Sequence, residues 1–245
     1  KSIEEAKTDT KIDGLFLNLS NLQAGLATVE EIRDALLDFK TSKKFIYAYS
    51  ESYSQGEYYL ASLADKVYLY PEGDIDFRGF RAELMFFKGT LEKLELQPEV
   101  IRHGKFKSAI EPFILDKMSP ENKEQTHAFI NSMWNQFISD IAKSRKLSAT
   151  DVQTVADNLG ARSGQDALDS KFVDQLSYYD EVLDELKKKT GLNSDDKVKL
   201  VDLKKYAESL PAIKEYSAKK IAVIYANGDI VSGKGDEEQM GSDKI

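Results

Sequence analysis

The chain has 245 residues, no cysteine and a formal net charge of -8, from 34 basic and 42 acidic side chains. This length is enough for one large or two small domains with a buried core. The acidic residues are dispersed among lysines and no strongly basic face is visible, so binding to nucleic acid is not expected. The lack of cysteine excludes disulfides, thiolate catalysis and thiolate metal sites. No stretch approaches the roughly 18 uninterrupted apolar residues of a membrane helix, and we expect this chain to be soluble.

The first part of the chain predicts strands and helices in alternation. Strands are expected at residues 11–19, 44–49 and 66–70, which are apolar runs bounded by polar or turn residues. A capping box at Thr28–Glu31 predicts the start of a helix. The apolar face of that helix would be formed by Val29, Ile32, Leu36 and Phe39. With a buried helix within residues 58–64, this order indicates an α/β fold with a parallel sheet.

The region that follows predicts shorter elements. Extended pieces are expected at residues 75–77 and 80–86, then a helix over 88–96 and a strand over 99–103. That strand would deliver the residues after it to an edge of the sheet.

Helices are predicted to dominate the remaining chain. Ser119 followed by Pro120 is typical of an N-cap and first helical position, and opens a long helix to about Arg145. Its apolar face would hold Phe129, Met133, Trp134, Phe137, Ile138 and Ile141. Ser148 is expected to cap another helix, and Gly191 to end a helix over residues 179–189.

The last fifty residues predict a change of domain. A polar break at 193–197 precedes a linker helix over 204–216 and a new apolar strand over 221–225. We therefore expect a first domain at 1–192, a linker region at 193–218, and the opening strand and loop of a truncated second domain at 219–245. The chain is interpreted as a fragment.

Lys107 is the best candidate for chemistry. It lies in the run GKFKSAIEPF at residues 104–113, beside Phe106, Ile110 and Phe113. A lysine amine can accept a proton from a serine hydroxyl only when it is neutral, and burial among apolar groups favours the neutral amine. We expect those neighbours to bury it. A serine within hydrogen-bond reach is also required, and on residue type alone a lysine that extends over apolar neighbours into solvent remains the alternative.

Other residues near this chemistry have more ordinary interpretations. Lys105 is the alternative lysine, two residues before Lys107. Ser54 is expected to cap the helix that follows it, with a vestigial catalytic site as the alternative. Ser108 could steady a neutral amine or face solvent. Glu111 is expected to point away from Lys107, since a nearby carboxylate would favour the charged amine.

Several motifs resemble the long, tandem form of signal peptide peptidase, the protease IV family. The run KSAIEPF at 107–113, followed by MSP at 118–120, is similar to the signature around that family's catalytic lysine. The runs YSQGEYYLAS at 53–62 and SGQDAL at 163–168, with Val173 and Asp174, resemble the family in the same order. The run IAVIYANG at 221–228 resembles the strand that opens its second half.

The resemblance implies a Clp protease/crotonase-like fold, a parallel sheet with surrounding helices, in each of two halves. It implies that Lys107 is the base and that the nucleophilic serine lies in the second half, beyond Ile245. It further implies a homotetramer anchored in the bacterial inner membrane, with its catalytic part in the periplasm, that cleaves signal peptides. Neither cofactor nor metal is expected, and the isolated fragment is expected to be inactive.

One loop departs from the family pattern. The active half carries a Ser-Pro-Gly-Gly element whose backbone amides serve an oxyanion hole, whereas residues 18–25 here read NLSNLQAG. This half is therefore expected to lack a complete acyl-transfer site and to lend a base to the other half. The alternative function is a non-catalytic crotonase-like module for assembly or peptide binding. Acyl-CoA chemistry ranks last because the paired glutamates are missing.

Overall fold

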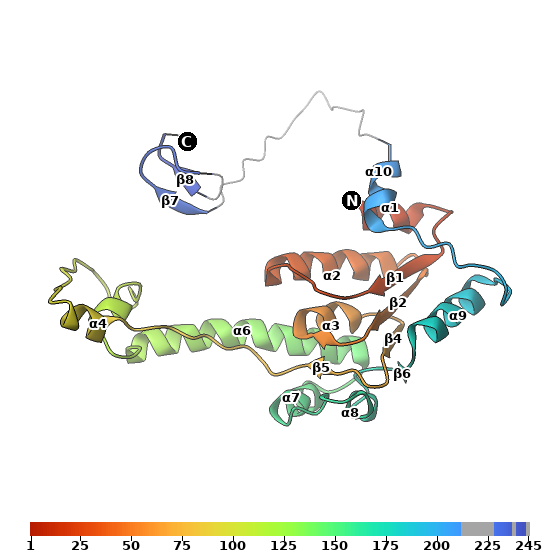
Figure 1. Ribbon diagram of the computed structural model, residues 1–245, viewed down its shortest axis with the longest axis horizontal. Helices are drawn as coiled ribbons and strands as arrows, with labels where there is room; N and C mark the ends of the chain where they lie inside the picture. Colours follow the sequence, from red (N-terminus) through yellow and green to blue (C-terminus); the bar gives the residue numbers. More distant parts are fainter. Residues whose placement is uncertain (212–227, 237–238, 244–245) are drawn as a thin grey trace. The chain divides into compact units, whose positions relative to one another are not determined.

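The computed structural model describes residues 1–211, 228–236 and 239–243. The chain divides into two compact units, Lys1–Val201 and Asp202–Ile245. The first unit is built on a four-stranded parallel sheet in the order β1-β2-β4-β6 (Figure 1). The predicted α/β fold with a parallel sheet is confirmed.

The strands are short and their register is well defined. The sheet consists of β1 (Gly14–Asn18), β2 (Phe45–Ser50), β4 (Lys66–Leu69) and β6 (Gln175–Leu176). Gly14 lies opposite Phe45, and Tyr47 lies opposite Lys66. A second, two-stranded parallel sheet pairs β3 (Tyr53–Ser54) with β5 (Ile75–Asp76).

Helices cover both faces of the four-stranded sheet (Figure 1). One face carries α2 (Leu26–Lys40), α3 (Gln55–Ala61) and the second half of α6 (Pro120–Arg145), and the other carries α9 (Tyr179–Thr190). The remaining helices of this unit are α1 (Ser2–Thr8), α4 (Lys88–Lys93), α5 (Glu111–Ile114), α7 (Ala149–Asp157) and α8 (Gly164–Asp169).

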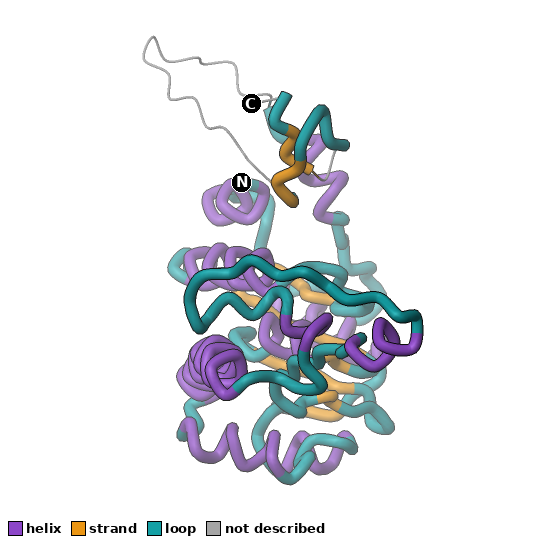
Figure 2. Tube along the Cα trace, turned by 90° about the vertical axis from the view of Figure 1, so that its left-hand side faces the viewer, coloured by secondary structure: helices purple, strands orange, loops and turns teal. Residues whose placement is uncertain are grey.

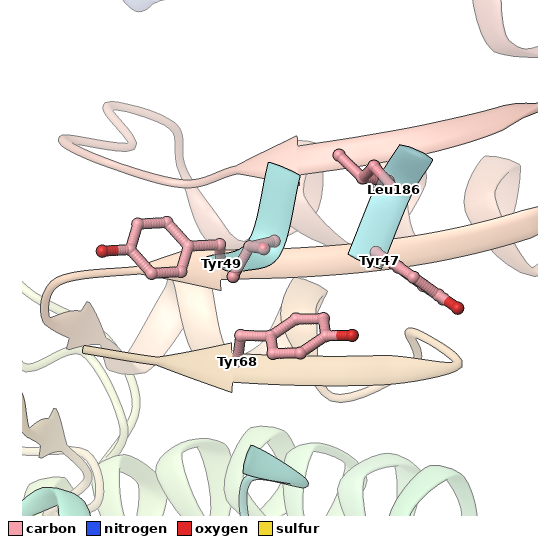
Figure 3. Close-up of a cluster of buried hydrophobic side chains, with 5 residues drawn as sticks. Tyr47, Tyr49, Tyr68 and Leu186 are labelled. Carbon is pink, nitrogen blue, oxygen red and sulfur yellow. The ribbon is translucent and has the colours of Figure 1, made fainter. Parts of the chain in front are cut away.

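The alternation of side chains along β2 creates a core on each side of the sheet. Tyr47 and Tyr49 pack with Tyr68 against Val182 and Leu186 of α9, as Figure 3 shows. Ile46, which precedes Tyr47, and Ala48, which lies between the two tyrosines in the sequence, are fully buried. Burial of both faces explains why β2 reads as a nearly continuous apolar run.

Arg33 joins the three helices on the α2 side. The side chain is 1% exposed, and its guanidinium donates to the backbone carbonyls of Tyr59 in α3 and Asp140 in α6. It also donates to the hydroxyls of Ser62 and Ser144. Burial lowers the pKa of Arg33, although nearby Tyr59 and the acidic groups Asp140 and Glu30 act in the opposite direction. The arginine therefore holds the second half of α6 against the sheet unit, meaning the four-stranded sheet with α2 and α3.

The first half of α6 leaves this core. From Trp134 onward one face of the helix is buried, whereas Phe129 is 64% exposed. The prediction that Phe129 belongs to the buried face is wrong, because the sheet unit ends before this part of the helix. Residues 80–118, with α4 and α5, accompany that end of α6, and Figure 2 shows the long loops there in teal.

Two local predictions are also wrong. Residues 99–103 form no strand, and the described hydrogen bonds give them no neighbouring strand that would supply a ladder. The helix α2 begins at Leu26 with Gly25 as its N-cap, so Thr28 lies inside the first turn and no capping box forms there. By contrast, α6 begins at Pro120 after the N-cap Ser119, and α9 ends at Gly191 in the left-handed conformation, as predicted.

The second unit contains α10 (Leu203–Ser209) and the parallel pair β7 (Asp229–Val231) and β8 (Gln239–Gly241). The strand predicted over 221–225 and the end of the linker helix, 212–216, lie outside the described residues. In the described ranges, no helix has the length and hydropathy needed to cross a membrane.

Candidate functional site

The loop that carries Lys107 connects α4 to α5. Gly104 has a φ of +95°, a conformation that favours glycine, and it starts the turn that leads into Lys107. The guanidinium of Arg102 donates to the backbone carbonyl of Lys107 over 3.3 Å. After the turn, the N–H of Glu111 donates to the carbonyl of Ser108 over 3.0 Å, and α5 begins at Glu111. The loop thus reaches Lys107 through a turn and leaves it through a helix start, instead of through the predicted strand.

Lys107 lines a surface hollow of about 480 Å³ between this loop and α6. One wall is the loop itself, from Phe106 to Ile110, with Arg102 beside it. The other wall comes from α6 and consists of Asn122, Gln125, Thr126 and Phe129. The amine is therefore placed next to both polar and apolar groups, a mixture that suits contact with polypeptide.

Lys107 is exposed in this chain. The expected burial by its neighbours is wrong, because Phe106 is 52% and Phe113 is 46% exposed, and both lie outside the sheet unit's core. Among the ion pairs of the described ranges, none includes Lys107. Only a further polypeptide that covered the hollow could exclude water from this amine.

Glu111 is 1% exposed and binds Asn122, a residue that lines the hollow. Its carboxylate accepts from the backbone N–H of Ser119 at 3.1 Å, from the Ser119 hydroxyl at 2.6 Å and from the Asn122 amide at 2.8 Å. Burial acts to raise the pKa of the Glu111 carboxyl, but these hydrogen bonds outweigh it and the pKa is lowered. Its partners lie at the start of α6, and no ion pair of the described ranges joins it to Lys107, while its direction relative to Lys107 stays a prediction.

Ser54 has the capping role that the sequence predicts. Its hydroxyl accepts from the N–H of Glu57 at 3.3 Å, and the Glu57 carboxylate accepts in return from the N–H of Ser54 at 2.8 Å. This is a capping box at the start of α3. The other oxygen of Glu57 accepts from the N–H of Leu22 at 2.9 Å, in the loop that lacks the glycine pair. A buried carboxylate of the same chain thus already occupies backbone donors at this helix terminus.

Gln55 fills the opposite side of the same terminus. Its side-chain oxygen accepts from the N–H groups of Arg78 and Gly79, at 3.0 and 2.9 Å. The amide nitrogen of Gln55 donates to the carbonyl of Gly79 over 3.4 Å. The backbone N–H groups of Arg78 and Gly79 are therefore paired with a side chain of the same chain.

The predicted residues separate into two places. Lys107 and Ser108 share the hollow beside α6, and Ser54 lies at the start of α3, beside the sheet. Sequence reasoning missed Asn122 and the attachment of Glu57 to Leu22. The attachment of Glu57 could not be found because its partner is 35 residues away, whereas Ser119-Pro120 close to Glu111 was a usable signal.

The sequence profile described as "Peptidase family S49" matches residues 38–193. The chain is 34% identical to "Protease 4" of Haemophilus influenzae over its full length, which is 41% of that protein. It is 35% identical to "Protease 4" of Salmonella typhi, with 99% of the chain and 40% of the relative aligned. It is 29% identical to "Serine protease SPPA, chloroplastic" of Arabidopsis thaliana, with 97% of the chain and 35% of that protein aligned. The chain thus spans about two fifths of the length of these relatives.

Proposed function

Because the chain belongs to peptidase family S49, whose members have the Clp protease/crotonase-like fold, we propose that it is the lysine-bearing part of a signal peptide peptidase. Lys107 acts as the general base for a serine that polypeptide outside this chain supplies. The observation that supports this role most directly is that Lys107 lines an open hollow beside α6, accessible to a second domain. The boundaries at 192 and 218 stay part of this proposal.

The chemistry needs one neutral amine and one hydroxyl. The Lys107 Nζ takes the proton from the serine hydroxyl while the serine oxygen attacks the scissile carbonyl and forms a tetrahedral intermediate. The resulting ammonium then gives this proton to the leaving amine, and the acyl-enzyme forms. A water then loses a proton to the same amine and attacks the acyl carbon, and the ammonium returns that proton to the serine oxygen as the second product leaves. A domain that covers the hollow would exclude water and so favour the neutral amine.

The α3 terminus supports the division of labour. Glu57 and Gln55 occupy the N–H groups of Leu22, Ser54, Arg78 and Gly79, and the nearby loop of residues 18–25 lacks the glycine pair that would turn two amides toward an oxyanion. The nucleophile and its oxyanion hole are therefore assigned to the second half, and this chain alone is expected to be inactive.

A matched pair of lysine variants tests the proposal in the full-length protein. Lys107→Ala should lower turnover of a fluorogenic signal-peptide-like substrate by about 10²- to 10⁴-fold, the usual contribution of a general base. Lys105→Ala, which removes an exposed lysine from the same turn, should change it less than threefold. Thermal unfolding should be the same for both variants. Turnover by Lys107→Ala close to that of the unmodified protein would contradict the proposal.

The exposed apolar side chains favour a second function, in assembly or peptide binding. Nine of those in the described residues lie in residues 84–129, at and around the N-terminal end of α6. The exposed fraction is 71% for Met85, 62% for Leu94 and 64% for Phe129. Apolar surface of this kind marks contacts between proteins, so we propose that it meets the second half, other copies of the protein or the apolar part of a signal peptide.

A double variant, Met85→Ser with Phe129→Ser, tests that surface. Sedimentation should show a smaller assembly for this variant, whereas Leu200→Ser, which changes an exposed leucine elsewhere, should not alter it. An unchanged mass together with unchanged substrate affinity would count against this surface. We also propose the bacterial inner membrane, with the catalytic part in the periplasm, as the location, which fractionation of cells would test.

A further inference from the structure

A buried carboxylate close in sequence to the proposed base takes no part in the chemistry above. Glu111 follows Lys107 by four residues and is 1% exposed, although the loop that leads to it is mostly exposed. A buried carboxylate without partners would be strongly unfavourable. Its burial therefore depends on the contacts that it makes.

All three hydrogen bonds of this carboxylate go to the first turn of α6. Ser119 is the N-cap of that helix and donates both its N–H and its hydroxyl to Glu111, and the Asn122 side chain donates from the third helical position. A negative charge at this place is also favoured by the dipole of a 26-residue helix. Glu111 is thus the attachment point between the lysine loop and α6.

The first turn of α6 also contributes Asn122 to the wall of the hollow that Lys107 lines. Asn122 lines the hollow with its amide held by Glu111, and its side-chain oxygen accepts from the hydroxyl of Thr126, another wall residue, at 3.2 Å. On the loop side, the N–H of Glu111 closes a turn onto Ser108, next to Lys107. One residue therefore fixes both walls relative to each other.

We infer that Glu111 is a positioning residue that sets the place of the Lys107 amine relative to α6, an inference that rests on the proposed function of Lys107 as the base. The described contacts of the loop at Lys107 itself are few, with the 3.3 Å bond from Arg102 to its carbonyl among them. Without the carboxylate, the loop and the α6 wall would separate while the sheet unit stayed folded. The amine would then sample positions away from the incoming serine.

Three variants of the full-length protein test this role. Glu111→Ala should lower kcat by about 10- to 100-fold, the usual effect of an ångström-scale misplacement of a reacting group, with little change in KM. Glu111→Gln keeps an acceptor for Ser119 N–H and Asn122, and its amide can donate to the Ser119 hydroxyl, so it should recover most of the turnover. Asp151→Ala is the matched control, because Asp151 is the carboxylate in the capping box of α7, far along the chain from Lys107.

Hydrogen exchange supplies a readout that does not depend on activity. Amides of residues 102–110 should exchange faster in Glu111→Ala and stay unchanged in Asp151→Ala. Unchanged exchange in this loop, or a kcat for Glu111→Ala equal to that of Asp151→Ala, would overturn the inference even if Lys107→Ala is inactive. If Lys107→Ala keeps its turnover, the proposed function fails instead, and faster exchange would leave Glu111 with a structural role only.

Discussion

The starts of α3 and α6 both combine a serine N-cap with a buried glutamate, but the two glutamates act differently. At α3, Glu57 caps the helix together with Ser54 and also binds the N–H of Leu22, so the carboxylate closes the site where a nucleophile could act. At α6, the Glu111 carboxylate accepts hydrogen bonds from Ser119 and Asn122, and the hollow that Asn122 lines is open. A buried glutamate beside a serine N-cap is therefore no sign of chemistry by itself. The two cases differ in whether the carboxylate binds groups at the place where a nucleophile could act, as Glu57 does, or holds the wall of the hollow, as Glu111 does.

The largest effect is expected for a substitution of Lys107, in the hollow beside α6. Lys107→Arg keeps the positive charge but places a guanidinium that stays protonated, so it cannot act as a base. Turnover of the full-length protein should fall by about 10²- to 10⁴-fold, as for alanine. A fluorophosphonate probe of the serine would report whether the nucleophile loses reactivity in parallel. Turnover similar to that of the unmodified protein would mean that only the charge at 107 is needed.

The next largest effect is expected at the start of α3. Glu57→Ala removes the acceptor of two backbone N–H groups, Leu22 and Ser54, and should lower the free energy of unfolding by about 2–4 kcal/mol. Chemical denaturation of the chain measures this value. Glu57→Gln retains one carbonyl acceptor and should lose about half as much. Turnover per folded molecule should stay constant, and a fall would show that the α3 terminus takes part in catalysis.

A smaller effect is expected at the serine of the same terminus. Ser54→Ala removes an N-cap hydroxyl and should cost about 1 kcal/mol of stability. The same denaturation measurement applies, with Ser54→Asp as a control that restores a capping oxygen. Loss of turnover beyond the loss of folded protein would revive the vestigial-site interpretation of Ser54.

The smallest effect is the pH dependence of the stability that Glu111 contributes at the start of α6. The folded state lowers the pKa of Glu111 through its bonds to Ser119 and Asn122, against the effect of burial and with help from the charge of Arg102. Its contribution to stability is therefore complete above the unfolded-state pKa and is lost as the pH falls through the lower, folded-state value. The Tm difference between the unmodified chain and Glu111→Gln should shrink from pH 7 to pH 3. A constant difference would contradict this assignment.

The sequence predicted those elements whose signals are local. Ser119-Pro120 marks the start of α6, and Gly191 marks the end of α9, because cap preferences depend on adjacent residues. The strand predicted over 99–103 failed because a strand needs a partner, which a local pattern does not show. Arg33 was missed for a similar reason, since its partners lie 26 to 111 residues away and make a charged side chain part of the core.

The site was predicted by motif more than by environment. The run around Lys107 indicated the loop of the candidate site, but the same residues suggested a buried amine, and the structure exposes it. Phe106 and Phe113 are apolar by type, yet no sheet or helix of the described chain covers them enough to enclose the lysine. Burial depends on what surrounds a loop in space, and the relatives are more than twice as long as this chain.

The length of α6 gives the core an influence over distant chemistry. At 1.5 Å per residue, its 26 residues extend about 39 Å, and about 27 Å of it separates the carbonyl of Asp140, held by Arg33, from Asn122 in the wall of the hollow. The contact with the buried arginine fixes the direction of the helix. A tilt of about 5° at that contact would move the wall by about 2 Å. Substitutions around Arg33 would thus change the catalytic geometry at the hollow, although they contact none of its residues.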